Sequence, residues 1–327
     1  MESALRVRPY QMLCLFCHQG QELAGSQGEA VRVLAEAIGS EPDMPVLLVC
    51  NAHDVYAYQD PGPREEIGGD EFNRKRDLDI LQVLDLAPGS ILPARTLLHR
   101  ILKAIPTVDG LCGHGDAPAA WRGCPRAEAG HYEAGAAKGI APLIQPRDPA
   151  QMNADKASSV AALEATDELR IRPHVIICAV CNYGNREGRY EPLAEDNIVE
   201  FIDLIRRRPD LKVTMAQGAD WMICAPCPQR VAHLNACVNV AGSGGLSNEK
   251  RDLDLLQVLG LTYGSSLPAR EMLKLIFERV PSTQAICRRD NPPLSVWWDG
   301  CGEANRDAGN VGYAKGREML SRELGLF

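Results

Sequence analysis

The most regular run of hydrophobic and polar positions lies between residues 250 and 281. In its second half, apolar side chains occupy the i, i+3, i+4 and i+7 positions of one helical face, at Leu273, Ile276, Phe277 and Val280. In its first half a leucine recurs every three residues, at Leu253, Leu256 and Leu259. The pattern predicts two helices, with a helix end at Gly264, an N-cap at Ser266 and Pro268 in the first turn of the second helix.

A closely similar segment occupies residues 75–106. Of the 32 positions in each segment, 19 are identical without a gap. A fixed internal offset of this kind indicates a tandem duplication. Each copy also opens with a short strand-like run, LRVRP at residues 5–9 and LRIRP at residues 169–173. The second copy has 11 additional residues between this run and the helical pair.

The remaining apolar patterns are short. They predict helices at residues 29–38 and 197–206, strands at residues 45–49 and 211–215, and a connecting helix at residues 154–169. Because helices outnumber the short strands, we expect an α+β fold that is internally duplicated, mostly helical and pseudo-two-fold in arrangement. A proline-rich linker divides it into a first copy with a degenerate cysteine set, residues 1–150, and a cysteine-rich, metal-binding second copy, residues 151–327.

An Arg-Asp-Leu-Asp motif opens the helical pair in both copies, at residues 76–79 and 251–254. The motif is compatible with an acid/base cluster. Acidic side chains are also favourable in the first turn of a helix, because they interact with its dipole. We therefore interpret the motif as a solvated helix start, and the helical pair as scaffold.

Charge and hydropathy argue against a nucleic-acid-binding or membrane protein. The net charge is −8 and the basic residues are dispersed, so the sequence lacks the basic patch of a nucleic-acid-binding protein. No apolar run approaches 18 residues, and the N-terminal segment MESALRVRPY has no hydrophobic signal-peptide core. The sequence predicts a soluble, cytoplasmic protein with neither a nucleic-acid nor a membrane partner.

The chain has twelve cysteines, which in a reducing compartment favour metal binding over disulfides. Each copy has a CxxC pair followed by two distant cysteines. These are Cys14, Cys17, Cys112 and Cys124 in the first copy, and Cys178, Cys181, Cys287 and Cys301 in the second. Four thiolates suit tetrahedral zinc or an iron–sulfur cluster, whereas buried thiols that bind nothing are the alternative.

The second copy adds Cys224-Ala-Pro-Cys227-Pro and Cys237, which have no counterpart in the first copy. A CxxC followed by proline forms a turn that exposes its sulfurs and supplies N–H groups to them, as thiolate metal sites require. A thioredoxin-like redox pair would need a strand–CxxC–helix unit, which this segment does not match.

The order of motifs in the second copy resembles a small prokaryotic family, domain of unknown function 1284, whose members are regarded as iron–sulfur-binding proteins. The resemblance rests on Arg172-Pro173-His174 with Cys178, Asp220 with Cys224-x-x-Cys227-Pro228, Cys237, Leu259-Gly260-Leu261, Ile286-Cys287, and Trp298 with Cys301. The chain departs from the family at Cys287-Arg-Arg-Asp290, where a carboxylate replaces an expected thiol, and at Cys17 and Cys181, which the family lacks.

Together the residues and the resemblance predict a metal site in the second copy. Four ligands are expected among Cys178, Cys181, Cys224, Cys227, Cys237, Cys287 and Cys301, with His174 against the cofactor or lining a pocket. The expected cofactor is an iron–sulfur cluster of the 4Fe-4S type, with zinc as the rival metal. The function would be redox or electron transfer with a partner protein; a zinc-stapled structural protein and a metalloenzyme using His174, Asp220 or Asp290 are the alternatives.

The first copy leaves two interpretations. Either its four cysteines form a second metal site, with His114 or His131 as possible additional zinc ligands, or the copy serves only as a packing partner. We expect the second, because the CxxC with the turn proline occurs only in the other half.

Overall fold

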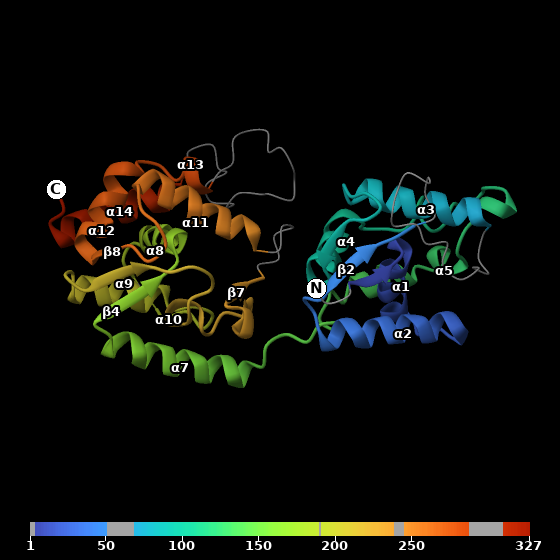
Figure 1. Cartoon of the computed structure of the whole chain (residues 1–327), viewed down its shortest axis with the longest axis horizontal. Coiled ribbons are helices and arrows are strands. Elements are labelled where there is room, and N and C mark those ends of the chain that lie inside the picture. The colour runs from blue at the N-terminus through green and yellow to red at the C-terminus, as the bar shows by residue number, and fades with distance from the viewer. Residues whose placement is uncertain (1–3, 51–68, 190, 239–244, 288–309) are drawn as a thin grey trace. The chain divides into compact units, whose positions relative to one another are not determined.

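The computed structural model describes residues 4–50, 69–189, 191–238, 245–287 and 310–327. The chain separates into two compact units, Met1–Pro146 and Arg147–Phe327. Both units combine several helices with a small sheet of short strands (Figure 1). The predicted α+β, mostly helical class is confirmed.

The sheet of the first unit has three strands, β1 (Leu5–Val7), β2 (Pro45–Leu48) and β3 (Ile91–Pro93). β2 is central: it pairs in parallel with β1 and antiparallel with β3. Its residues Val46 and Leu48 are buried, so the strand joins the sheet to the core of this unit.

The helices of the first unit connect and cover these strands. They are α1 (Pro9–Gly20), α2 (Gly25–Ser40), α3 (Asp70–Val83), α4 (Ala94–Ala104), the 3-10 turn η1 (Ala119–Trp121), α5 (Pro125–Glu128) and α6 (His131–Ala136). α1 begins directly after β1 because Pro9 occupies its first turn, where a missing N–H is tolerated.

The second unit has a sheet of the same order and sense. β4 (Glu168–Ile171) is parallel to β5 (Lys212–Met215), and β5 is antiparallel to β8 (Ser266–Pro268). A separate two-stranded ribbon joins β6 (Arg230–Val231) to β7 (Ala236–Cys237). The duplication itself remains an interpretation of the sequence.

Helices again surround the sheet of the second unit. They are α7 (Pro149–Ala165), α8 (Pro173–Asn185), α9 (Ile198–Arg207), α10 (Trp221–Cys224), the 3-10 turn η2 (Ala232–Leu234), α11 (Leu246–Leu259), α12 (Ala269–Arg279), α13 (Gln284–Cys287) and α14 (Val311–Leu324). The apolar face predicted for α12 is buried, at Leu273, Ile276 and Phe277.

The predicted junction within the helical pair is wrong. Ser266 does not cap a helix, because Ser266–Pro268 is strand β8 and pairs with β5. α11 ends earlier than expected, at Leu259, and is capped by Gly260, which adopts φ +69°, a conformation that glycine tolerates without cost. The short strand escaped the hydrophobic pattern because three residues are too few to show an alternation.

Closely packed helices position the cysteine-bearing elements. α8 lies against α14 and α1 lies against α6, and glycines line both contacts. A Cβ atom at Gly184 would lie 1.9 Å from the Gly312 carbonyl oxygen, and one at Gly20 would lie 1.9 Å from the His131 carbonyl oxygen. Only glycine allows these backbones to approach so closely.

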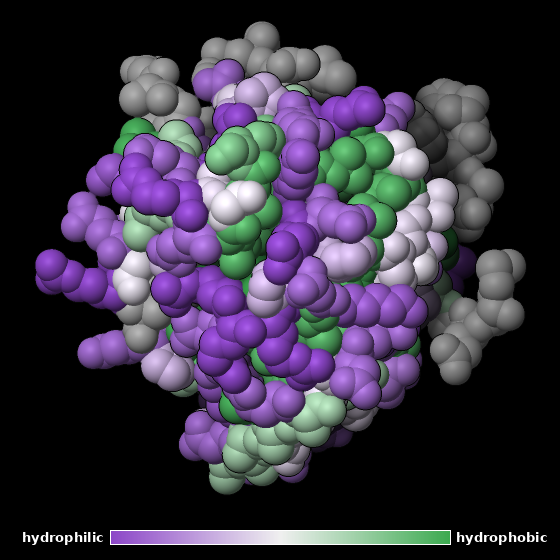
Figure 2. Space-filling model, turned by 90° about the vertical axis from the view of Figure 1, so that its left-hand side faces the viewer, coloured by the Kyte–Doolittle hydropathy of each residue, from purple (hydrophilic) through white to green (hydrophobic). Residues whose placement is uncertain are grey.

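The face shown in Figure 2 is mainly hydrophilic, with smaller hydrophobic areas between the polar residues. Isolated exposed apolar side chains are normal on protein surfaces. Among the residues that the structure describes, no helix combines the length and apolar character that crossing a membrane requires.

Candidate metal centre

A buried polar network lies where helices α8 and α11 meet. The Asp252 carboxylate accepts hydrogen bonds from Arg172 Nε at 2.8 Å and from His174 Nδ1 at 2.6 Å. Arg172 Nη2 lies 2.7 Å from the same carboxylate, and the His174 backbone N–H donates to it over 3.0 Å. Asp252 is completely buried, so the prediction of a solvated Arg-Asp-Leu-Asp motif is wrong at this residue.

The ionisation of this network follows from its burial. Burial lowers the pKa of His174, which outweighs the opposing effect of Asp252. Burial disfavours the Asp252 carboxylate, but the interactions with His174 and Arg172 hold its pKa below the usual value. We therefore assign a neutral imidazole that donates its Nδ1–H to an ionised carboxylate. Nε2 then has a lone pair, which is the form of histidine that binds metals or accepts protons.

Three predicted ligands form one group, which we name the central thiol group: Cys224, Cys227 and Cys237. Cys224 is the last residue of α10, and the Cys227 N–H donates to its carbonyl over 3.0 Å. Cys237 lies in β7, where it pairs with Arg230, three residues after Cys227. Burial raises the pKa of Cys224 to about 12, and the charges of Cys227 and Cys237 act in the same direction. The three side chains are therefore close enough to interact electrostatically.

The CxxC turn supplies a donor to its own sulfur. Burial raises the pKa of Cys227, and a hydrogen bond from the Gln229 backbone opposes that rise. The side-chain amide of Asn248, near the start of α11, lies 3.5 Å from Cys237 Sγ. Both cysteines of the turn are partly buried, whereas the sequence led us to expect exposed sulfurs.

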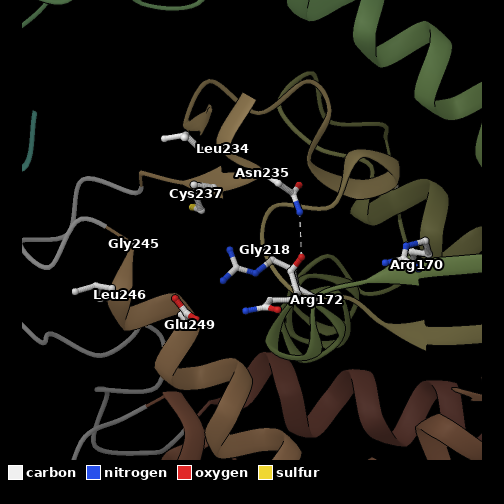
Figure 3. A pocket seen from close by; sticks show the side chains of 11 residues that line it. Arg170, Arg172, Gly218, Leu234, Asn235, Cys237, Gly245, Leu246 and Glu249 are labelled. Atoms are coloured by element: carbon white, nitrogen blue, oxygen red, sulfur yellow. Dashed lines mark hydrogen bonds between the residues drawn. The ribbon is translucent and has the colours of Figure 1, made fainter. Parts of the chain in front are cut away.

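Arg172 joins the buried network to the central thiol group. Its positive charge lowers the pKa of Cys224, and Cys237 also interacts with it electrostatically. A cavity of about 490 Å³ adjoins Arg172 and Cys237, and Arg170, Gln217 and Glu249 also line it. Figure 3 shows Cys237 and Glu249 on either side of the Arg172 guanidinium. Arg172 only partly offsets the effect of burial on Cys224, so this thiol stays protonated unless a metal binds it, beside a space that a small molecule could enter.

The other predicted ligands lie on different elements. Cys178 and Cys181 are on α8 and Cys287 is on α13. The Asn310 amide donates to Cys181 Sγ at 3.0 Å. Burial raises the pKa of Tyr313; Arg317 opposes this rise, and Cys181 and Cys287 add to it. Both thiols therefore lie near this ring. Cys301, Asp290 and Trp298 lie outside the described residues.

No preformed metal site is present in the described part of the chain, because no three Cys, His, Asp or Glu side chains there have the required arrangement. The sulfurs are grouped but not at coordination spacing. Metal binding would therefore have to draw them closer together, as expected where coordination is coupled to folding.

The first unit has a partial counterpart of the buried network. Arg8 Nε lies 2.7 Å from the buried Asp77 carboxylate, and the Tyr10 N–H donates to the same carboxylate over 3.3 Å. Tyr10 stands where the second unit has His174, and the Arg76 guanidinium lies 3.8 Å from the centre of the Tyr10 ring. The first unit thus keeps the Arg–Asp pair but lacks the imidazole.

Sequence reasoning missed Arg172 and Asp252 as site residues. The signal was present, because both copies keep an arginine before the first proline of α1 or α8 and an aspartate in the repeated motif. An arginine and an aspartate that both copies retain indicate an ion pair, even though either side chain alone could lie on the surface.

Comparison with known proteins identifies no relative: no family model, no curated protein and no solved structure matches the chain. The resemblance to the iron–sulfur-binding family therefore gains no support from these comparisons.

Proposed function

We propose that the second unit is a metal-thiolate module that binds an iron–sulfur cluster for redox or electron-transfer work. The observation that carries this proposal is the central thiol group beside the buried Arg172. Three sulfur ligands favour zinc or iron–sulfur chemistry over magnesium or calcium, which prefer oxygen. A fixed guanidinium also offsets the negative charge that thiolates bring to a cluster.

A fourth ligand would complete a 4Fe-4S site. The remaining candidates from the sequence are His174, Cys178, Cys181, Cys287 and Cys301. His174 is held in the tautomer that leaves Nε2 available, which favours it as a ligand or as a hydrogen-bond partner of the centre. The proposal includes a cytoplasmic location, because a reducing compartment keeps thiols available, and a redox partner protein.

A second function is favoured by the cavity next to Cys237. Three protein ligands beside an accessible space are typical of a metal that keeps an open position for a substrate. A metalloenzyme acting on a small molecule is therefore the alternative. In that case His174 would be the proton-transferring group; it pairs with Asp252 but is buried and does not line the cavity, so it would act through a neighbouring group. Zinc is the rival metal in either function.

The test is metal analysis of anaerobically purified protein and of the Cys224→Ser, Cys227→Ser double variant. We expect iron and acid-labile sulfide in the wild type and neither in the variant, because the variant retains only one thiol of the group. Cys50→Ser is a matched control, since Cys50 is buried in the other unit. Stoichiometric zinc without iron or sulfide would show that the bound metal is zinc and not a cluster. Iron that remains bound in the double variant would refute the assignment of Cys224 and Cys227 as ligands.

A further inference from the structure

The cavity beside Arg172 has the size of a small-molecule site. Its volume is about 490 Å³, and pockets that hold metabolites and cofactors measure about 300–1,000 Å³. Its walls come from β4, the loop after β5, strand β7 and the start of α11. All of these elements belong to the second unit, so the cavity is part of the fold of one unit.

Arg172 presents unused hydrogen-bond donors to this cavity. The residue is only 4% exposed, and a guanidinium group has five N–H bonds. Nε and Nη2 lie 2.8 and 2.7 Å from Asp252 Oδ2, so this carboxylate occupies one edge of the guanidinium. Nη1 has no acceptor among the residues that the structure describes. A buried donor without an acceptor is costly, and an oxyanion bound in the cavity would supply one.

Glu249 is a second charged group on the cavity wall. It lies in the first turn of α11 and lines the same space as Arg172. Within the described part of the chain it forms no ion pair, because Arg172 pairs with Asp252 instead. Figure 3 shows the Glu249 carboxylate and the Arg172 guanidinium on neighbouring parts of the wall. A carboxylate and a guanidinium edge therefore adjoin one space without neutralising each other.

The charge balance of the cavity decides which class of ligand fits. Arg170, the other arginine on the wall, lies 3.3 Å from Asp220, and Asp252 offsets the charge of Arg172. Glu249 is left as a wall carboxylate without a counter-ion in the described residues. A ligand that is only anionic would be repelled by Glu249, and a ligand that is only cationic would be repelled by Arg172. A zwitterion avoids both repulsions.

We propose that this cavity binds a free α-amino acid, whose carboxylate accepts from Arg172 Nη1 and whose ammonium group donates to the Glu249 carboxylate. Charge-assisted hydrogen bonds of this kind are stronger than neutral ones. The inference goes beyond metal binding, because it uses the two charged side chains and the cavity, not the sulfur atoms. Cys237 lines the cavity as well, so the amino acid would lie beside the central thiol group.

Isothermal titration calorimetry on the full-length protein tests the proposal. Each of the standard L-amino acids is titrated singly, and we expect at least one to bind. For the tightest of them, the deaminated carboxylic acid and the decarboxylated amine should each bind at least about tenfold more weakly, because each lacks one charge-assisted hydrogen bond. The proposal is overturned if no amino acid binds, or if either analogue binds as tightly as the amino acid itself.

Glu249→Gln tests the position of the ammonium group. The variant should bind the amino acid at least about tenfold more weakly, without weaker binding of the carboxylic acid analogue. Glu249 is exposed, so we expect the variant to fold. Glu271→Gln, in the first turn of α12 and away from the cavity, is the matched control and should change neither affinity. Equal amino-acid affinity in the two variants would contradict the proposal.

Metal analysis of the same samples keeps this result separate from the proposed function. Amino-acid binding by protein that contains no iron would support the cavity assignment and refute the cluster. A cluster in protein that binds no amino acid would refute the cavity assignment alone.

Discussion

Asp252 and Asp254 are two residues apart in helix α11 but have opposite surroundings. Asp252 is completely buried with Arg172 and His174, whereas Asp254 forms a surface pair with Lys250, four residues earlier. Both belong to one Arg-Asp-Leu-Asp motif, and the sequence alone does not show which aspartate is buried. Their roles depend on which face of the helix meets α8, and this is decided by tertiary packing.

The difference between the two aspartates is measurable. Asp252→Asn leaves Arg172 buried without its carboxylate, so we expect the free energy of unfolding to fall by about 3–5 kcal/mol. Asp254→Asn removes only a surface pair between residues i and i+4, and we expect a loss below about 0.5 kcal/mol. Urea unfolding followed by circular dichroism compares the two variants. Equal losses would mean that the buried network does not stabilise the second unit.

At the scale of elements, the longer apolar patterns were predictable, whereas short strands such as β8 were not, because three residues show no alternation. The cysteine-bearing helices α1 and α8 were not expected either. The expected strand at residues 45–49 is β2, and the helix expected at residues 197–206 is α9, one residue later. The contacts between helices were not predictable. The close pairing of α1 with α6 depends on Gly20 and Gly135, which are more than 100 residues apart and show no periodic pattern.

A substitution in α6 tests this contact. Gly135→Ala should destabilise the first unit by about 1–3 kcal/mol, because the new Cβ atom would lie 1.8 Å from the Phe16 carbonyl oxygen. Gly39→Ala in α2 is the control, since its nearest neighbour, the Leu143 carbonyl oxygen, would be 3.1 Å away. Thermal unfolding should separate the two. If Gly135→Ala were as stable as Gly39→Ala, the helices would not pack as closely as described.

At the scale of the whole chain, the sequence supplied the cysteines but not their grouping. Counting thiols gave seven candidates in the second half, and the structure gathers Cys224, Cys227 and Cys237 at one place and Cys181 and Cys287 around Tyr313. It also packs Cys14, Cys17 and Cys112 against one hydrophobic core in the first unit, where the sequence led us to expect only a packing partner. Spacing along the chain limits which ligands are possible, whereas the fold decides which of them meet.

The most direct test of the central claim is X-ray absorption of the metal in anaerobically purified protein. The account predicts iron with a first shell of sulfur atoms at about 2.3 Å, as thiolate coordination by the central thiol group requires. A first shell made only of nitrogen and oxygen atoms at about 2.0–2.2 Å would contradict it, as would protein that is folded and contains no stoichiometric metal.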